Sequence, residues 1–282
     1  MEIGFYGGSF TGIAAEEQEW YLKIGHSYIQ SGRVDSMRIS TRPDYISGEI
    51  LGMLRKYGVR TIELGAQSLD DEILRSSNRG HDIETVSKAA AMIRKYGFSL
   101  GIQTMIGLPG DSREKSLLTA ERVVRMGPDM VRIYPTLVIK NTYLEKMYRE
   151  GRYTPLSTEE AADICAELLE IYENNHINVI RIGLQPTDSI SETGEVEAGP
   201  FHPAFRQLVE ARLMLNKMER YVRQNGFEKI PDIVIEANPK EISNVVGQKR
   251  QNIIKLKEMF NFKNIKVETK DEIDLFLIKK FN

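Results

Sequence analysis

The sequence predicts an α/β fold built on a parallel sheet. From residue 2 to about residue 184, short apolar or β-branched segments alternate with amphipathic helical segments. Two junctions nearly repeat, Arg55–Val59 and Arg94–Phe98, and in both a basic last helical turn and a glycine lead into the next strand. Regular β–α alternation favours parallel strands joined by right-handed crossovers, in either a doubly wound sheet or a barrel.

Six strands and seven helices are expected in this part of the chain. The strands are expected at Glu2–Tyr6, Met37–Ser40, Thr61–Leu64, Ser99–Met105, Met130–Tyr134 and Val179–Leu184. The helices are expected at 15–31, 46–57, 70–77, 83–96, 112–126, 141–150 and 157–175. Four of them end in a glycine that suits the left-handed position after a helix, namely Gly32, Gly58, Gly97 and Gly127.

A different pattern follows the sixth strand. A segment rich in Ser, Glu, Gly and Pro at 187–203 predicts a loop, and a long helix is expected at 202–225. The tail then has the order strand, helix, turn, helix, strand and a final helical or strand piece. These tail elements are expected at Asp232–Glu236, Lys240–Val246, Gly247–Arg250, Asn252–Phe260 and Asn264–Glu268.

Composition narrows the class of protein. Of 282 residues, 41 % are apolar and 28 % charged, as in ordinary globular proteins, and no run approaches the ~20 apolar residues of a membrane span. The single cysteine, Cys165, excludes an internal disulfide or an all-cysteine metal site within the chain, and it favours a cytoplasmic location. Cys165 is expected to be a buried apolar side chain, and the histidines His26, His81 and His176 to be surface or capping residues. A net charge of −2 restricts any nucleic-acid binding to a local patch.

Every predicted strand ends in glycine or proline together with polar side chains. Glycine lets a backbone approach a ligand closely, and Gln, Arg, Ser and Thr supply hydrogen-bond donors for a ligand with a carboxylate and hydroxyls. One such turn usually serves only to reverse the chain, but six in series indicate a shared site for an amino acid or nucleoside. The segments are Gly7–Gly12, Ser40–Asp44, Glu63–Ser68, Gln103–Asp111, Arg132–Leu137 and Arg181–Thr187.

The motifs at these strand ends resemble those of radical S-adenosylmethionine (SAM) enzymes. The resemblance spans about residues 2–190 and is closest to the branch of the Elongator catalytic subunit, with oxygen-independent coproporphyrinogen oxidase further away. It is carried by Gly7–Phe10, Thr41–Asp44, Glu63–Ser68, Gly107–Gly110 and Tyr134–Val138.

This resemblance implies a fold, a cofactor and a chemistry. The fold is an incomplete (β/α)₆ barrel, here missing its first β/α unit, since the strand at Met1 corresponds to the second strand of the family. In the family a CxxxCxxC loop holds a [4Fe–4S] cluster that reduces SAM to methionine and a 5′-deoxyadenosyl radical. A ferredoxin or flavodoxin would supply the electron, and tRNA or another RNA base would be the substrate.

The resemblance also assigns roles to residues. Gly7, Gly8 and Ser9 would hold the methionine amino group of SAM, Gln67 and Arg79 its ribose or carboxylate, and Gln103 its ribose or adenine. The adenine wall would be Gly107, Leu108 and Pro109, and Ser40 takes the place of a carboxylate in relatives. Arg132, Tyr134 and His202 are the candidates for substrate contact.

Three departures change the expected chemistry. The cysteine loop is absent, so the chain as given is expected to lack the cluster and not to cleave SAM. Ser9 replaces the glutamate of many relatives, and Gln103 replaces the aspartate of the coproporphyrinogen enzyme. No acetyl-CoA loop of the pattern Q/R-x-x-G-x-G/A follows residue 190, so acetyl transfer is not expected.

The tail resembles a KH nucleic-acid-binding module, in which a GXXG loop between two helices clamps a nucleotide backbone. Here the loop is Gly247–Arg250, and Lys249, Arg250, Lys255 and Lys257 form a basic patch. The alternative is a helix-turn-helix cap on the barrel.

We expect a partial barrel at 1–190, a loop and closing helix at 191–228, and the KH-like module at 229–282. A second functional hypothesis is a non-catalytic RNA-binding scaffold.

Overall fold

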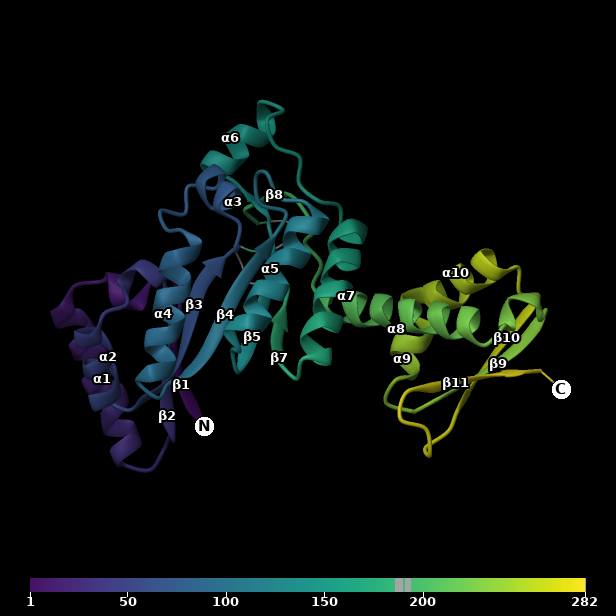
Figure 1. Cartoon of the computed structure of the whole chain (residues 1–282), viewed down its shortest axis with the longest axis horizontal. Coiled ribbons are helices and arrows are strands. Elements are labelled where there is room, and N and C mark those ends of the chain that lie inside the picture. Colours follow the sequence, from purple (N-terminus) through teal and green to yellow (C-terminus); the bar gives the residue numbers. More distant parts are fainter. Residues whose placement is uncertain (186–189, 191–193, 282) are drawn as a thin grey trace. The chain divides into compact units, whose positions relative to one another are not determined.

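The computed structural model describes residues 1–185, 190 and 194–281 (Figure 1). It contains two compact units. Unit 1 comprises Met1–Ser157 and Ile171–Phe201, and unit 2 comprises Thr158–Glu170 and His202–Asn282. No helix in the described ranges is both long enough and apolar enough to cross a bilayer.

Unit 1 is built on one six-stranded parallel sheet, and all six predicted strands are confirmed. The strand order is β1-β2-β3-β4-β5-β7, which is a partial α/β barrel of the predicted kind. The strands are β1 (Glu2–Phe5), β2 (Ser36–Thr41), β3 (Val59–Gln67), β4 (Ser99–Ile106), β5 (Met130–Pro135) and β7 (Asn178–Ile182). Because every pair is parallel, the carboxyl ends of all six strands lie at the same edge of the sheet.

The seven helices expected in this part of the chain are also present. They are α1 (Ala15–Gln30), α2 (Gly48–Lys56), α3 (Asp71–Ser76), α4 (Ile83–Lys95), α5 (Arg113–Met126), α6 (Tyr143–Arg149) and α7 (Thr158–Asn174). Helices α4 and α5 cover one face of the sheet (Figure 1). Several begin at a side-chain cap: Asp82 accepts a hydrogen bond from the Thr85 amide at 2.8 Å. Helix α5 ends at Gly127, whose φ of 60° is the left-handed conformation that favours glycine.

One loop expectation is wrong in part. Within the segment predicted as a loop at 187–203, Val196–Ala198 forms strand β8, which pairs antiparallel with β6 (Val138–Ile139). Both strands are too short to produce a period of two in the sequence, and the Lys140 amide extends the pairing by donating to the Glu195 carbonyl at 2.8 Å. Residues 186–189 and 191–193 of that segment lie outside the described residues.

Strand β1 is at one end of the strand order, so one side of its backbone has no strand partner among the described residues. The neighbouring helix α1 buries Leu22 on one face and carries a second apolar stripe that is exposed. Trp20 is 58 % exposed, and Tyr21, Ile24 and Tyr28 are each about 40 % exposed. An open strand edge beside an exposed aromatic helix face is a surface of the kind that binds a further segment of protein.

Unit 2 has a three-stranded sheet of order β10-β9-β11. Strand β9 (Asp232–Ala237) is parallel to β10 (Asn264–Thr269) and antiparallel to β11 (Phe276–Lys280), so the final piece of the chain is a strand. The helices α9 (Ile242–Val246) and α10 (Gln251–Phe260) connect the parallel pair, as predicted.

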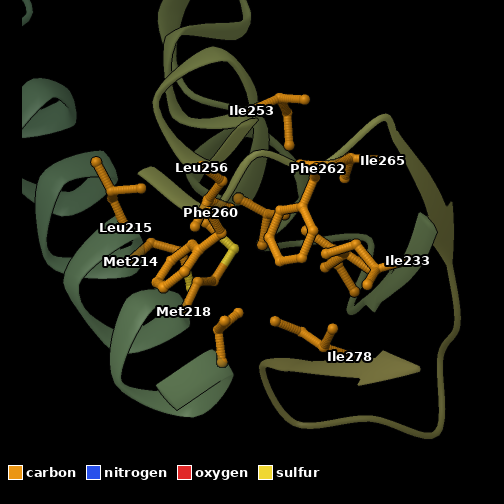
Figure 2. Packing of buried hydrophobic residues seen from close by; sticks show 14 residues of the cluster. Met214, Leu215, Met218, Ile233, Ile253, Leu256, Phe260, Phe262, Ile265 and Ile278 are labelled. Carbon is orange, nitrogen blue, oxygen red and sulfur yellow. The ribbon is translucent and has the colours of Figure 1, made fainter. Parts of the chain in front are cut away.

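The core of unit 2 also takes in the long helix α8 (Phe205–Gln224). Its side chains Met214, Leu215 and Met218 pack against residues of the sheet and of α10, including Leu256 and Ile233 (Figure 2). The expected division of the chain at residues 190 and 228 remains a prediction.

Replacing Leu256 should destabilise unit 2. Leu256 is fully buried in this core, so Leu256→Ala removes apolar contacts and leaves a cavity, at a cost of about 2–5 kcal/mol. Amide hydrogen exchange of β9 should accelerate accordingly. The matched control is Ile254→Ala on the same helix, where the side chain is 43 % exposed and exchange should change little. Equal acceleration in both variants would contradict this description of the core.

Candidate functional site

The predicted site residues of unit 1 lie at the common carboxyl edge of the sheet. Gly7, Gly8 and Ser9 follow β1, Gln67 ends β3, and the segment from Gly107 follows β4. These strand ends therefore lie on the same side of the sheet, as a shared site needs. Around this edge the described structure contains a buried ion network and two separate pockets.

The ion network is centred on Glu63 of β3, whose side chain is 1 % exposed. Arg132 donates to it through Nε at 2.6 Å and Nη2 at 3.0 Å, and Arg38 donates through Nη1 at 2.9 Å. Gln103 donates at 2.9 Å and the Tyr6 hydroxyl at 3.0 Å. Both carboxylate oxygens therefore accept several hydrogen bonds, which is the condition for keeping a charge inside a protein.

These partners determine the protonation state of Glu63. Burial alone would raise the pKa of Glu63, but hydrogen bonds from Arg132, Gln103 and Arg38 outweigh it and lower the pKa to about 2. The carboxylate in turn raises the pKa of Arg132 against the effect of burial. Glu63 and Arg132 are therefore a permanently charged pair at neutral pH.

Two predicted SAM contacts belong to this network. Gln103 Nε2 also donates to Ser40 Oγ at 3.1 Å, so its amide joins β2, β3 and β4 across the sheet.

Tyr134 lies two residues after Arg132 on β5 and is half-buried. Burial raises the pKa of its phenol, while nearby Arg132 opposes the shift. Arg132 and Tyr134 thus line the interior side of the sheet.

A pocket of about 680 Å³ opens beside Arg79. Its walls include Met105, Leu108 and Pro109, and it extends along Thr136 to Met147. Two of the three residues predicted as an adenine wall, Leu108 and Pro109, are therefore in one pocket with Arg79. Both side chains are buried in the protein, so the wall is apolar and fixed.

Arg79 has an unusual environment for an arginine. Its Nε is buried without a hydrogen-bond partner, and Nη2 reaches only the Met105 sulfur, at 3.1 Å. Burial, and then the charge of Arg42, lower the pKa of Arg79, and no carboxylate contributes to the shift. A desolvated guanidinium with an unused donor is a site for an anionic group.

The loop after β4 is held in place by its own hydrogen bonds. The Gly107 amide donates to the Asp111 carboxylate at 2.8 Å, and the Gly107 carbonyl accepts from the Tyr153 hydroxyl at 2.6 Å. A Cβ on Gly107 would lie 2.9 Å from Leu156, and its φ of 72° favours glycine. Burial raises the pKa of Asp111 although it accepts three hydrogen bonds.

The glycine motif after β1 lines a second pocket, of about 370 Å³. Gly7 and Gly8 are exposed, with φ of 106° and 156°, and an added Cβ on either would meet open space. Ser9 lies beside them, and Phe10 and Tyr21 supply apolar wall. The motif therefore leaves its backbone accessible, as a ligand contact requires.

The remaining candidates are distributed between the two units. Gln67 follows a bulge in β3 and has a φ of 65°, with its side chain folded over Gly65. His202 lies in unit 2, where its Nδ1 accepts a hydrogen bond from the Ala204 amide at 3.1 Å. Lys249, Arg250 and Lys255 are also in unit 2.

Two family profiles match consecutive parts of the chain. The Radical SAM superfamily profile matches residues 2–123, and the Radical_SAM C-terminal domain profile matches residues 128–214. The chain belongs to the radical SAM superfamily.

The relatives that this radical SAM chain matches include tRNA uridine(34) acetyltransferases and Elongator complex protein 3. It is 31 % identical over 184 residues to the tRNA uridine(34) acetyltransferase of Methanocaldococcus infernus and 33 % identical over 192 residues to Elongator complex protein 3 of Saccharomyces cerevisiae. The matches cover 58 % and 61 % of this chain, and the chain spans 34 % of each relative's length. The solved structure of archaeal Methanocaldococcus infernus Elp3 with residues 1–46 deleted matches with a TM-score of 0.66 and 26 % identity, over 80 % of this chain and 54 % of that one.

The two cofactors of the radical SAM superfamily fit this chain differently. The cationic guanidinium of Arg79 lines the pocket and suits a carboxylate such as that of SAM, and Leu108 and Pro109 suit an adenine ring. The [4Fe–4S] cluster does not fit. The sole cysteine, Cys165, is completely buried, burial raises its thiol pKa, and the described residues contain no cluster of three metal-ligating side chains.

Sequence reasoning missed the centre of the polar network. The strand-end motif Glu63–Ser68 contains Glu63 but gives no indication of its role. No sequence motif indicates a role for Arg38 or Asp111. A carboxylate inside the buried strand Thr61–Ala66 was the available signal, because such a group requires cationic partners. Cys165, in contrast, is buried as predicted.

Replacing Glu63 should destabilise unit 1 in a pH-dependent way. Glu63→Gln leaves Arg38 and Arg132 without their shared carboxylate, at a cost of about 3–5 kcal/mol at pH 7. The folded-state pKa of Glu63, about 2, lies below the ordinary value of 4.5, so the carboxylate's contribution is complete above pH 4.5 and decreases as the pH falls toward 2. Denaturation followed by circular dichroism should show the two proteins converging over that range. Glu84→Gln, which removes a carboxylate that is 72 % exposed, is the control and should show no such convergence. A constant difference at all pH values would contradict the assignment.

Proposed function

We propose that this chain is the SAM-binding part of a radical SAM protein that acts on tRNA. The observation that carries the proposal is Arg79, a desolvated guanidinium whose Nε has no partner, on the wall of a pocket of about 680 Å³. A carboxylate ligand in the pocket would accept hydrogen bonds from the Arg79 guanidinium, and its charge would offset the cost of burying the arginine.

The same pocket supports the adenine of a SAM molecule. Leu108 and Pro109 offer apolar wall for a planar base, and the hydrogen bonds of Gly107 keep that wall in position. The proposed contacts of Gly7, Gly8, Ser9, Ser40, Gln67 and Gln103 with SAM remain predictions of this function. Among them, Gln103 and Ser40 are already bonded to each other, so they would act by fixing the sheet beneath the ligand.

This chain has no residues to hold a [4Fe–4S] cluster, so in this proposal a cluster with ligands outside the chain would supply the electron for reductive cleavage of SAM. A ferredoxin or flavodoxin would be the donor. The open edge of β1 and the exposed stripe Trp20, Tyr21, Ile24 and Tyr28 on α1 offer that segment a strand partner and an apolar helix face. The proposed location is the cytoplasm.

The proposed RNA partner rests on the relatives' names. Two of them are called tRNA uridine(34) acetyltransferase and Elongator complex protein 3, and this chain matches about a third of each. Acetyl transfer is not part of the proposal, because no acetyl-CoA loop pattern follows residue 190.

A second candidate function is a non-catalytic RNA-binding scaffold. The observation that favours it is Cys165, the only cysteine of the chain, which is buried among apolar neighbours and cannot ligate iron where it lies. Under this alternative the barrel is retained for its shape, and SAM is not bound.

Arg79 should determine affinity for the carboxylate of SAM. Arg79→Gln should weaken SAM binding by at least about tenfold, measured by isothermal titration calorimetry, because it removes a charge-assisted hydrogen bond. Binding of 5′-methylthioadenosine, which lacks the carboxylate, should be unaffected. Arg125→Gln, at an exposed arginine outside the pocket, is the control. No SAM binding by the wild-type chain would favour the scaffold.

Iron–sulfur reconstitution provides a separate test. Anaerobic treatment of the chain with iron and sulfide should give no cluster absorbance and no 5′-deoxyadenosine, because the only thiol is buried. Cys165→Ala should behave identically. Formation of a redox-active cluster by the wild-type chain alone would contradict this account of the cofactor.

A further inference from the structure

The turn between α9 and α10 in unit 2 has a constrained backbone. Gly247 has a φ of 72°, and a Cβ there would lie 2.9 Å from Asn252 Cγ and 3.1 Å from the Asn252 amide nitrogen. The next residues, Lys249 and Arg250, also have positive φ, of 49° and 61°. Non-glycine residues rarely adopt this conformation, so the surrounding structure must hold them in it.

Asn252 supplies that support. Its side chain is buried, and its Nδ2 donates to the Ala211 carbonyl of α8 at 2.7 Å and to the Asn244 carbonyl of α9 at 2.8 Å. The first turn of α10 is thereby joined to two other helices. The side chains of Lys249 and Arg250 are presented from a fixed backbone.

Lys249, Arg250 and Lys255 gather at this turn, and the charge of Lys255 opposes the burial that raises the pKa of nearby Asp163. No ion pair involving Lys249, Arg250 or Lys255 occurs among the described residues. Other basic residues of unit 2 are paired: Arg212 lies 2.7 Å from Asp163, and Lys279 lies 2.8 Å from Glu236. A local group of unpaired cations raises the affinity of a surface for an external anion.

A pocket of about 290 Å³ adjoins the turn within unit 2. Lys249 and Lys255 both line it, so two of the three unpaired cations face one concavity. Gln248, Gln251 and His202 add polar groups, and among the described lining residues Glu159 is the one acidic side chain. The pocket is therefore mainly a site for hydrogen-bond acceptors.

Apolar side chains continue the surface along α10. Ile254 and Met259 are 43 % and 41 % exposed. Helical spacing puts Ile254 on the same face as Gln251, which lines the pocket, and Met259 on the same face as Lys255. A small anion such as free phosphate cannot pack against these apolar side chains, so they do not raise its affinity. They do raise the affinity for a nucleotide, because its base or ribose can pack on an apolar side chain while its phosphate contacts a cation.

We infer that unit 2 binds the sugar–phosphate backbone of single-stranded RNA at the turn Gly247–Arg250 and along α10. Lys249, Arg250 and Lys255 contact phosphates, and Ile254 contacts a base or ribose. The inference rests on the proposed RNA partner and identifies where this chain holds it. The strand–helix–turn–helix–strand order of β9, α9, α10 and β10 is the context in which KH modules hold nucleotides.

The test is binding of a fluorescently labelled ten-nucleotide RNA to the full chain, measured by anisotropy over a range of salt concentrations. The double variant Lys249→Glu/Arg250→Glu should bind at least tenfold more weakly. Its plot of log K against log salt should lose about 0.7 of slope for each phosphate contact removed. Ile254→Ser should weaken binding with the salt slope unchanged.

The control is Lys229→Glu/Lys280→Glu, which makes the same charge change at exposed sites of unit 2 outside the pocket lining. Its affinity should remain within twofold of wild type. Equal losses in the two double variants, a duplex bound as tightly as the single strand, or competition by millimolar inorganic phosphate would each overturn the inference, as would a wild-type chain that binds no RNA.

SAM binding of the same variants separates this inference from the proposed function. Lys249→Glu/Arg250→Glu should leave SAM affinity unchanged, since the Arg79 pocket lies in unit 1. If RNA binding follows the prediction and SAM does not bind, the proposed function fails alone. If SAM binds and the double variant retains full RNA affinity, the further inference fails alone.

Discussion

The interior of the barrel depends on one buried carboxylate and the two arginines that neutralise it. Glu63 has no exposure to share its charge with water, so Arg38 and Arg132 must supply the compensating hydrogen bonds from β2 and β5. Gln103 completes the set from β4. The network therefore spans four adjacent strands and restrains their relative positions beneath the carboxyl edge, where the candidate ligand site lies.

Arg79 differs from the two arginines of this network in its hydrogen bonding. Arg132 is satisfied by a carboxylate, whereas Arg79 is desolvated with an unused donor and only a thioether sulfur beside it. A protein gains no stability from such a group, which is why we connect it with a ligand instead of with the fold. The loop from Gly107, held by Asp111 and Tyr153, gives that ligand a fixed wall. Unit 2 has a similar arrangement at its surface, where a rigid turn presents cations that form no ion pair with the residues that the structure describes.

Much of this site followed from the order of residues along the chain. The glycine turns after β1 and β4 are expected at one edge because parallel strands bring their carboxyl ends together. The roles of Arg79, Leu108 and Pro109 come instead from the resemblance to radical SAM enzymes. The hub Glu63 was not selected, since hydrogen bonds between strands 25 to 69 residues apart leave no periodicity in a sequence. For the same reason Gln103 was expected to face the ligand, although its amide is bonded to Ser40 and Glu63.

By itself the sequence determined the six strands of the main sheet and their order along the chain, the helix ends, the burial of Cys165 and the absence of cluster-binding cysteines, because these depend on local spacing and residue type. The tertiary structure alone decided which polar groups neutralise one another and which remain unpaired. It also decided that β6 and β8 pair across some 55 residues and that α8 shares a core with the C-terminal sheet. Such outcomes depend on distances between segments remote in the chain, and those distances exist only after the chain has packed.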